Sequence, residues 1–326
     1  MSQIVWLFWN RKQGRLRSGW RVAVHFSLWI ILPSIIGGIF GTPLAQWIMR
    51  QAPGLTPIAE RAVGNGLTLV SALLGTWMAT FFLDHRPFAD LGLRFNRDWW
   101  VDFLFGLTLG GVLISGIFLV ELALGWVEVT GLFQVAQPGV PFALAMLGPI
   151  IVFIVIGITE ELLARGYEIR NLAEGFNLPL WGPGGAVVVA WVVSSSLFGL
   201  LHVFNPNATW HSTLYLMVAG LFLGIGYILT GTLAIPIGLH ITWNFVQGNI
   251  FGFPVSGNDF TTQATVIAIH QEGPALWTGG AFGPEAGLIG LAAMLIGSVL
   301  TMAWVYHRYG NVALDQRLAV YRRPDN

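Results

Sequence analysis

The segment Gly157-Ile158-Thr159-Glu160-Glu161-Leu162-Leu163-Ala164-Arg165-Gly166-Tyr167 places two acids and an arginine at the end of a long apolar run. A charge at the centre of a bilayer span costs roughly 2.5–3.5 kcal/mol on insertion scales, so ionisable residues inside a span are functional candidates. On a helix Glu161 and Arg165 are four residues apart with the acid on the N-terminal side, which favours an ion pair. Glu160 is turned by about 100° from Glu161, so its partner must come from another helix, from water or from a substrate.

The composition is typical of a membrane protein. Of the 326 residues, 55% are hydrophobic and only 10% are charged, and the mean hydropathy is +0.68. The absence of cysteine excludes a disulfide framework, a thiol nucleophile and a thiolate metal site. The net charge is zero and no extended basic region exists, which gives no support to nucleic-acid binding.

Runs of apolar residues predict eight membrane-spanning helices, because a helix needs about 20 residues to cross about 30 Å of hydrocarbon. The expected spans are 20–40, 62–83, 101–126, 142–165, 184–203, 212–230, 234–251 and 285–306. We therefore expect an all-α, polytopic membrane protein built as a bundle of about eight transmembrane helices. Residues 1–326 should form a single membrane-embedded domain, with a core of sequence motifs at about 142–251.

The positive charges predict the orientation of the chain, since short cytoplasmic segments carry an excess of Lys and Arg. If both termini are cytoplasmic, only Arg50 and Arg61 fall outside. The inner residues are Arg11, Lys12, Arg15, Arg17, Arg21, Arg86, Arg94, Arg97, Arg165, Arg170, Arg308, Arg317, Arg322 and Arg323. We expect an integral, multi-pass protein of the cell membrane with both termini cytoplasmic. The Gly-, Pro- and Thr-rich segment 252–284 should be an outer loop of low regular structure.

Two later spans each contain a pair of residues one helical turn apart. Phe198 and His202 share a helical face, so the phenyl ring can restrict the imidazole; alternatively, His202 only marks the end of its span at the interface. His240 and Asn244 also point the same way and can donate two hydrogen bonds into one cavity, as an oxyanion requires. The alternative for this second pair is a polar clamp between packed helices.

A carboxylate, an imidazole, and a paired imidazole and amide form the minimum set for hydrolysis of an amide by activated water. An acid and the first imidazole can deprotonate and hold the water. The second imidazole and the amide can stabilise the developing oxyanion. The signal lies in the joint presence of these groups.

The same residues resemble the motifs of the CAAX protease and bacteriocin-processing (CPBP/Abi) family of intramembrane proteases. This family includes the eukaryotic type II CAAX prenyl endopeptidase and many bacterial Abi proteins. Its pattern E-E-x-x-x-R matches 160–165, its F-x-x-x-H matches 198–202, and its H-x-x-x-N matches 240–244. The three motifs occur in the order that the family shows and cover about residues 150–250.

The resemblance implies a glutamate-type intramembrane endopeptidase. By this comparison Glu160 works with His202 to activate water, and His240 forms the oxyanion site with Asn244. The residues that would support the site are Glu161, Arg165 and Phe198. The implied partners are membrane lipid and a peptide or protein substrate, either lipidated or a leader peptide.

Zinc has to be weighed as a cofactor, because members of the family are often labelled metalloproteases. Two histidines and a glutamate can supply three ligands to a catalytic zinc, but the chain has no H-E-x-x-H pair. An oxyanion site accounts for both His240 and Asn244, whereas a metal accounts poorly for Asn244. We therefore expect no cofactor and no metal ligand, with zinc as the alternative.

Two other functions remain open. The same fold can act as a non-catalytic membrane scaffold or a bacteriocin-immunity protein, although intact motifs argue against this role. Glu160 and Glu121 could instead lie on the proton path of a transporter, but the two halves of the chain show no evident repeat. Glu121 has no local partner, so it lies either in the same cavity or at the interface beside Trp126 and Glu128.

A simple topology conflicts with a shared site. Straight spans put Glu160 and His240 toward the cytoplasmic side and His202 toward the opposite side, and at about 1.5 Å per residue the mismatch exceeds about 10 Å. These side chains can meet if the fifth span is tilted, if it begins below the interface after a re-entrant stretch at 178–185, or if the site lies near the midplane.

Overall fold

The computed structural model describes residues 7–51, 56–260 and 264–322. The helices are α2 (Ser18–Ile36), α3 (Thr42–Gln51), α4 (Thr56–Met78), α5 (Arg97–Ala123), α6 (Phe142–Glu161), α7 (Arg170–Phe176), α8 (Gly182–Leu201), α9 (Trp210–Thr230), α10 (Ala234–Phe245), α11 (Ala275–Thr278) and α12 (Leu288–Tyr309). π-Helical turns continue four of them, at Gly37–Gly41, Ala79–Leu83, Leu162–Ile169 and Val246–Ile250. Short 3-10 turns lie at Phe88–Leu91, Gly280–Phe282, Pro284–Ala286 and Gln316–Ala319.

The fold class predicted from the sequence, an all-α polytopic membrane protein, is confirmed. In the described ranges, seven helical segments are long and apolar enough to cross a membrane: Ser18–Ile48, Val63–Leu83, Arg97–Ala123, Phe142–Phe176, Gly182–Leu201, Trp210–Thr230 and Leu288–Tyr309. The remaining expected span, 234–251, is also helical, as α10 and the π-helical turn that ends at Ile250. It is shorter than the other seven and lies among them.

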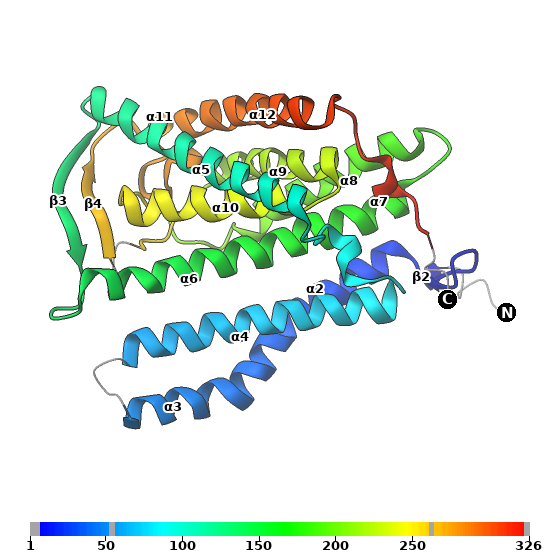
Figure 1. Ribbon diagram of the computed structural model, residues 1–326, viewed down its shortest axis with the longest axis horizontal. Helices are drawn as coiled ribbons and strands as arrows, with labels where there is room; N and C mark the ends of the chain where they lie inside the picture. Colours follow the sequence, from blue (N-terminus) through cyan, green and yellow to red (C-terminus); the bar gives the residue numbers. More distant parts are fainter. Residues whose placement is uncertain (1–6, 52–55, 261–263, 323–326) are drawn as a thin grey trace.

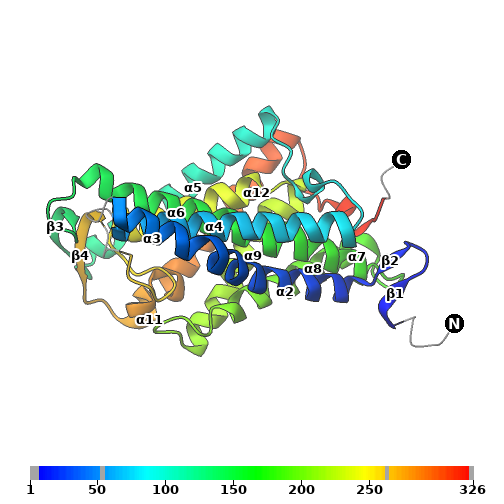
Figure 2. The same cartoon turned by 90° about the horizontal axis from the view of Figure 1, so that it is seen from below.

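The helices form two layers of unequal size. Figure 1 shows α2, α3 and α4 on one side of α6, with α5, α8, α9, α10 and α12 on the other side. Figure 2, seen from the side of the smaller layer, shows α2, α3 and α4 lying across the front of the bundle. The larger layer surrounds α10, which packs most extensively against α5 and also contacts α6 and α9.

Glycine allows α10 to approach α5 closely. A Cβ atom on Gly106 of α5 would overlap backbone atoms of Ile235 and Leu239, and one on Gly238 of α10 would overlap the backbone of Phe103. Small residues at helix interfaces are the usual way for membrane helices to pack, because they bring the backbones together. The contact places α10, with its two polar side chains, deep in the bundle.

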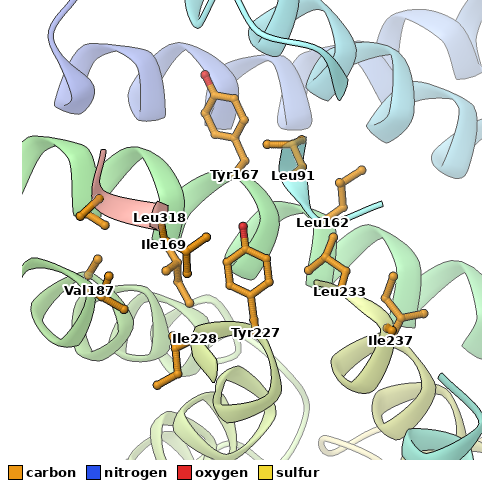
Figure 3. Close-up of a cluster of buried hydrophobic side chains, with 14 of the residues drawn as sticks. Leu91, Leu162, Tyr167, Ile169, Val187, Tyr227, Ile228, Leu233, Ile237 and Leu318 are labelled. Carbon is orange, nitrogen blue, oxygen red and sulfur yellow. The ribbon is translucent and has the colours of Figure 1, made fainter. Parts of the chain in front are cut away.

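The largest cluster of buried apolar side chains joins the two layers (Figure 3). Tyr167, from the π-helical continuation of α6, points toward the smaller layer, and its ring stacks on His25 of α2 with ring centroids 3.8 Å apart. Tyr227 of α9 lies in the same cluster, and its hydroxyl is 3.4 Å from the carbonyl oxygen of Gly166. The cluster therefore fixes α2 and α9 relative to the segment that follows Glu160.

The segment 252–284 contains more regular structure than its composition predicted. Its strand β4 (Ala264–Gln271) pairs antiparallel with β3 (Val127–Val135), and α11 follows. The expectation of low regular structure was wrong because the β-branched and apolar residues of β4 form a strand only against a partner more than a hundred residues earlier. A second small sheet pairs β1 (Trp9–Asn10) with β2 (Arg15–Leu16).

The N-terminal strands β1 and β2 and the 3-10 turn Gln316–Ala319 lie at the same end of the bundle, beside α7 (Figure 1). Buried charges hold this end together. Arg15 pairs with Glu174 at 2.6 Å, and Arg21 pairs with Asp84 at 2.6 Å. The guanidinium of Arg15 also lies 3.3 Å from the ring centroid of Tyr321. These contacts join the N-terminal strands, the segment after α4, α7 and the C-terminal tail.

Candidate active site

Glu160, the first acid of the E-E-x-x-x-R motif, lies near the middle of a long helix. The expected span 142–165 was too short, because the helix continues through Leu162–Ile169 and α7 to Phe176. The antiparallel helix α8 begins at Gly182 and returns alongside, so His202, directly after its end at Leu201, reaches the level of Glu160. This arrangement removes the expected mismatch in depth between these two side chains.

Side chains from three helices meet around one carboxylate oxygen. The Oε2 atom of Glu160 lies 4.0 Å from Nε2 of His202 and 3.9 Å from Nε2 of His240. The Glu160 side chain keeps 26% of its surface exposed, whereas that of His240 keeps 6%. Catalytic hydrogen bonds are often long before a substrate binds, so these separations are compatible with a water held between the carboxylate and the imidazoles.

The orientation of His202 is set from its own helix. Its Nδ1 atom lies 2.7 Å from the carbonyl oxygen of Phe198. A carbonyl oxygen can only accept a hydrogen bond, so Nδ1 carries the proton and, in the neutral ring, Nε2 presents its lone pair toward Glu160. The Phe198 ring packs against the imidazole with centroids 4.8 Å apart, as the four-residue spacing predicted.

Glu161, the second acid of the E-E-x-x-x-R motif, orients the imidazole of His240. Its Nδ1 atom lies 2.7 Å from Oε1 of Glu161, and Nη1 of Arg165 lies 2.8 Å from the same oxygen. The ion pair predicted between Glu161 and Arg165 is therefore present, and it also includes His240. Arg165 is fixed further by its hydrogen bond to the carbonyl oxygen of Gly220 at 3.0 Å and by the Phe198 ring, whose centroid is 4.4 Å from its Cζ.

The four residues with expected catalytic roles line one cavity of about 330 Å³: Glu160, His202, His240 and Asn244. Its volume is in the range of small-molecule and cofactor sites. Most of the other lining side chains are apolar, among them Phe153, Leu163, Phe222 and Trp243. The Asn244 side chain makes no hydrogen bond within the part of the chain that the structure describes, so its amide is available to a group in the cavity.

Two further acids line this cavity, and sequence reasoning missed both. Glu168 lies on the continuation of α6, and Glu285 lies just before α12. On a regular α-helix Glu168 would be turned by about 80° from Glu160, so helical spacing did not indicate it; residues Leu162–Ile169 are π-helical instead. Nothing in the local sequence around Glu285 points to the cavity, because it arrives there through the packing of the segment between β4 and α12.

Glu121 does not line the cavity. It is fully buried in α5, and its Oε2 atom accepts a hydrogen bond from Nε2 of Gln271 at 2.6 Å. The expectation that Glu121 lines the cavity was wrong; it lies near the end of α5, where its carbonyl oxygen accepts a hydrogen bond from the backbone N–H of Trp126 at 2.9 Å. It contacts strand β4 instead, a contact that depends on the unexpected β3–β4 pairing.

The donor atoms of the site do not have the spacing of a zinc centre. Tetrahedral zinc with nitrogen and oxygen ligands holds those ligand atoms about 3.3 Å apart, whereas the two imidazole nitrogens lie 4.0 and 3.9 Å from the Glu160 carboxylate. Across the described ranges, no three His, Asp or Glu side chains form a group that could hold a metal ion. The residues as placed do not fit zinc, and we assign no chemical step to a metal.

Comparison with known proteins gives one match. Residues 142–246 match the family model described as type II CAAX prenyl endopeptidase Rce1-like, whereas neither the curated proteins nor the solved structures gave any match. The matched region contains α6, α7, α8, α9 and α10, together with all three sequence motifs. The resemblance of this multi-pass membrane protein to the CAAX protease family is thus confirmed over residues 142–246, which include Glu160, His202, His240 and Asn244.

Proposed function

We propose that this protein is an intramembrane endopeptidase in which Glu160 and His202 activate a water molecule. The family match implies a membrane endopeptidase acting on peptides or proteins. The observation that carries the finer mechanism is the convergence of Glu160, His202, His240 and Asn244 on one cavity near the middle of a span.

The first step is attack on the peptide carbonyl. The water donates one hydrogen bond to Oε2 of Glu160 and the other to the free lone pair on Nε2 of His202. As its oxygen bonds to the carbonyl carbon, one proton passes to Glu160, which acts as the general base. The peptide carbonyl oxygen becomes the oxyanion of a tetrahedral intermediate.

The second step breaks the peptide bond. The intermediate collapses, the C–N bond breaks, and the proton held by Glu160 passes to the leaving nitrogen. The products are a new carboxyl group and a new amine, and Glu160 returns to its ionised form. One carboxylate thus serves first as base and then as acid.

The oxyanion would be held by His240 and Asn244. The amide of Asn244 donates directly, since it is unused in the described structure. The Nδ1 proton of His240 is directed to Glu161, so Nε2 can donate only when the ring carries a proton on both nitrogens. The carboxylates of Glu160 and Glu161 lie on opposite sides of this ring and would balance its positive charge.

The substrate that fits best is a membrane-borne peptide or protein, with membrane lipid as its surroundings; a lipidated segment and a leader peptide are both candidates. The transporter alternative has less support, because Glu121 binds Gln271 and does not line the cavity of Glu160. A non-catalytic scaffold would not require Glu160, His202, His240 and Asn244 to meet at one cavity.

The experiment is cleavage by the purified protein in lipid vesicles. A mixture of membrane-anchored peptides with varied sequences is incubated with the protein, and products are identified by mass spectrometry. Cleavage products that require Glu160 would support the proposal. A folded wild-type protein that cleaves none of the mixture, while binding its members, would favour the scaffold.

A further inference from the structure

The cavity is acidic beyond what the hydrolytic mechanism requires. Three carboxylic acids line it, Glu160, Glu168 and Glu285, but no Lys or Arg does so in the described ranges. Arg165 is nearest in sequence, but its guanidinium is bound to Glu161 and to the carbonyl oxygen of Gly220. The mechanism uses Glu160 only, which leaves the other two acids without a catalytic task.

Of the two acids without a catalytic task, Glu168 has the fewer hydrogen-bond partners. It is 3% exposed, and the one side chain bonded to it is Ser194, whose Oγ lies 3.1 Å from Oε2. The same hydroxyl lies 2.7 Å from the carbonyl oxygen of Ala164. A serine has a single O–H, and the Ala164 carbonyl can only accept, so the serine cannot satisfy both oxygens at once. By contrast, Glu285 is bound by Gln247 and by Ser256.

Glu168 makes no direct ion pair in the described ranges, although the charge of Arg165 acts on it from the same helix. A buried acid without a direct ion pair is costly inside a membrane span, which marks it as a functional candidate. Glu168 has a cavity in front of it and lies on the face of the helix that carries Glu160 and Ala164. A cation brought by a ligand would supply the missing partner. The Ser194 hydroxyl and the helix would hold the carboxylate in place for it.

The distance along the helix sets where on a peptide this cation would lie. Eight residues separate Glu160 from Glu168, which is at most about 12 Å at the α-helical rise of 1.5 Å per residue, because the π-helical turn Leu162–Ile169 rises less. An extended peptide covers about 3.3–3.6 Å per residue. The carboxylate of Glu168 is therefore within reach of a group about four residues from the bond that Glu160 attacks.

We propose that Glu168 forms a subsite for a positive charge on the substrate, an ammonium or guanidinium group within about four residues of the scissile bond. The inference rests on the proposed function for the position of that bond. A lysine side chain, an arginine side chain or a free amino terminus would each supply such a positive charge. Glu168 would repel a carboxylate at the same place, so we expect a substrate with an acidic end there to bind more weakly.

The test measures binding in the absence of cleavage. The Glu160→Gln protein is placed in lipid nanodiscs and titrated with fluorescent apolar peptides that are blocked at both ends. One series carries a single lysine moved along the sequence, and a matched series carries norleucine at the same positions. A third arm uses the norleucine peptides with a free amino terminus, which separates a side chain from a terminal amine.

We expect the best-placed lysine or free amine to strengthen binding by about 10–100-fold over its neutral match, since hydrogen bonds to charged groups are worth more than neutral ones. Adding Glu168→Gln should reduce this preference to less than about twofold and leave the neutral peptides bound as before. The control Glu272→Gln removes an exposed acid and should keep the preference. Should Glu168→Gln fail to fold, Glu168→Leu supplies a second uncharged variant.

Two outcomes would overturn the inference. One is equal binding of charged and neutral peptides by the Glu168-intact protein, and the other is a preference that persists in the folded Glu168 variants. Cleavage by the wild-type protein is scored separately. Cleavage without charge preference would leave the endopeptidase standing and remove this subsite. A charge preference that depends on Glu168, without any cleavage, would support the subsite and contradict the proposed endopeptidase function.

Discussion

The Nδ1 atom of His240 lies 2.7 Å from Oε1 of Glu161, so a residue of α10 is oriented by an acid of α6. The same oxygen accepts a hydrogen bond from Arg165 at 2.8 Å. Glu161 therefore pairs with Arg165 in its own helix and also positions the imidazole of His240 in the cavity. Glu160 lines the cavity and Glu161 does not, so we expect the two adjacent acids to have different tasks.

Replacing Glu161 should destabilise the fold. Glu161→Gln leaves Arg165 buried without its anionic partner, and breaking a buried pair in this way costs roughly 3–5 kcal/mol. We expect a lower yield of folded protein and a lower melting temperature in nanodiscs. The matched control is Arg94→Gln, which breaks an exposed pair with Asp90 at the same spacing and should melt like the parent. Parent-like melting of Glu161→Gln would show that the pair does not stabilise the protein.

Replacing Asn244 should affect the rate more than binding. The amide is expected to meet the oxyanion, which exists only after attack, so its loss removes transition-state stabilisation. Removal of one oxyanion donor typically costs about 10²–10³ in kcat. Asn244→Ala should therefore show a lower kcat with KM within about threefold of the parent, measured on a cleaved peptide. A large rise in KM with unchanged kcat would assign Asn244 to substrate binding instead.

Glu285 should make stability depend on pH. It precedes α12, and burial raises the pKa of its carboxyl from the ordinary 4.5 to about 7, although hydrogen bonds from Ser256 and Gln247 partly oppose the shift. Between these two values the folded protein keeps a proton that the unfolded chain has released. The free energy of unfolding should therefore fall as pH rises from about 4.5 to above 7.

The measurement is thermal unfolding at pH 5 and pH 8 for the parent and for Glu285→Gln. The neutral amide has the shape of the protonated acid and does not titrate, so the fall in melting temperature between the two pH values should be smaller in the variant. An equal fall in both proteins would mean that Glu285 does not titrate in this range.

The charge distribution predicts that β4 lies outside and both termini inside. The natural chain has no cysteine, so single cysteines can report on orientation. His270→Cys places a thiol on β4 at a side chain that is 59% exposed, and Lys12→Cys places one in the N-terminal segment. Membrane-impermeant labelling of intact cells should modify position 270 and not position 12. The opposite pattern would invert the topology.

Local spacing predicted part of the site correctly. The Glu161–Arg165 pair and the Phe198–His202 contact each lie within one helix, where a separation of four residues fixes the geometry. The meeting of Glu160 with His202 and His240 depends on how three helices pack, and no single pattern in the sequence contains that information. Only the resemblance to the three family motifs indicated that these side chains belong to one site.

Charged residues misled the prediction of where the fourth span ends. The expected span ended at 165, which puts Arg165 at its cytoplasmic end and Glu168 and Glu174 beyond it. In the structure all three are buried, Arg165 against Glu161, Glu174 against Arg15, and Glu168 at the cavity. Glu174 pairs with a residue of another segment, and Glu168 lies at a cavity built by several helices, so the continuation of the helix to Phe176 could not be predicted from hydropathy.

In the proposed mechanism Glu160 is the base that activates water without a metal. The most direct measurement compares the wild-type protein with Glu160→Gln on one cleavable membrane peptide, each with and without a chelator, using Glu272→Gln as a control for an exposed acid. Loss of a positioned base should lower the rate of Glu160→Gln by at least about 10²-fold, while the chelator leaves the wild-type rate unchanged. Full cleavage by folded Glu160→Gln, or wild-type activity that is abolished by the chelator and restored by zinc, would contradict it.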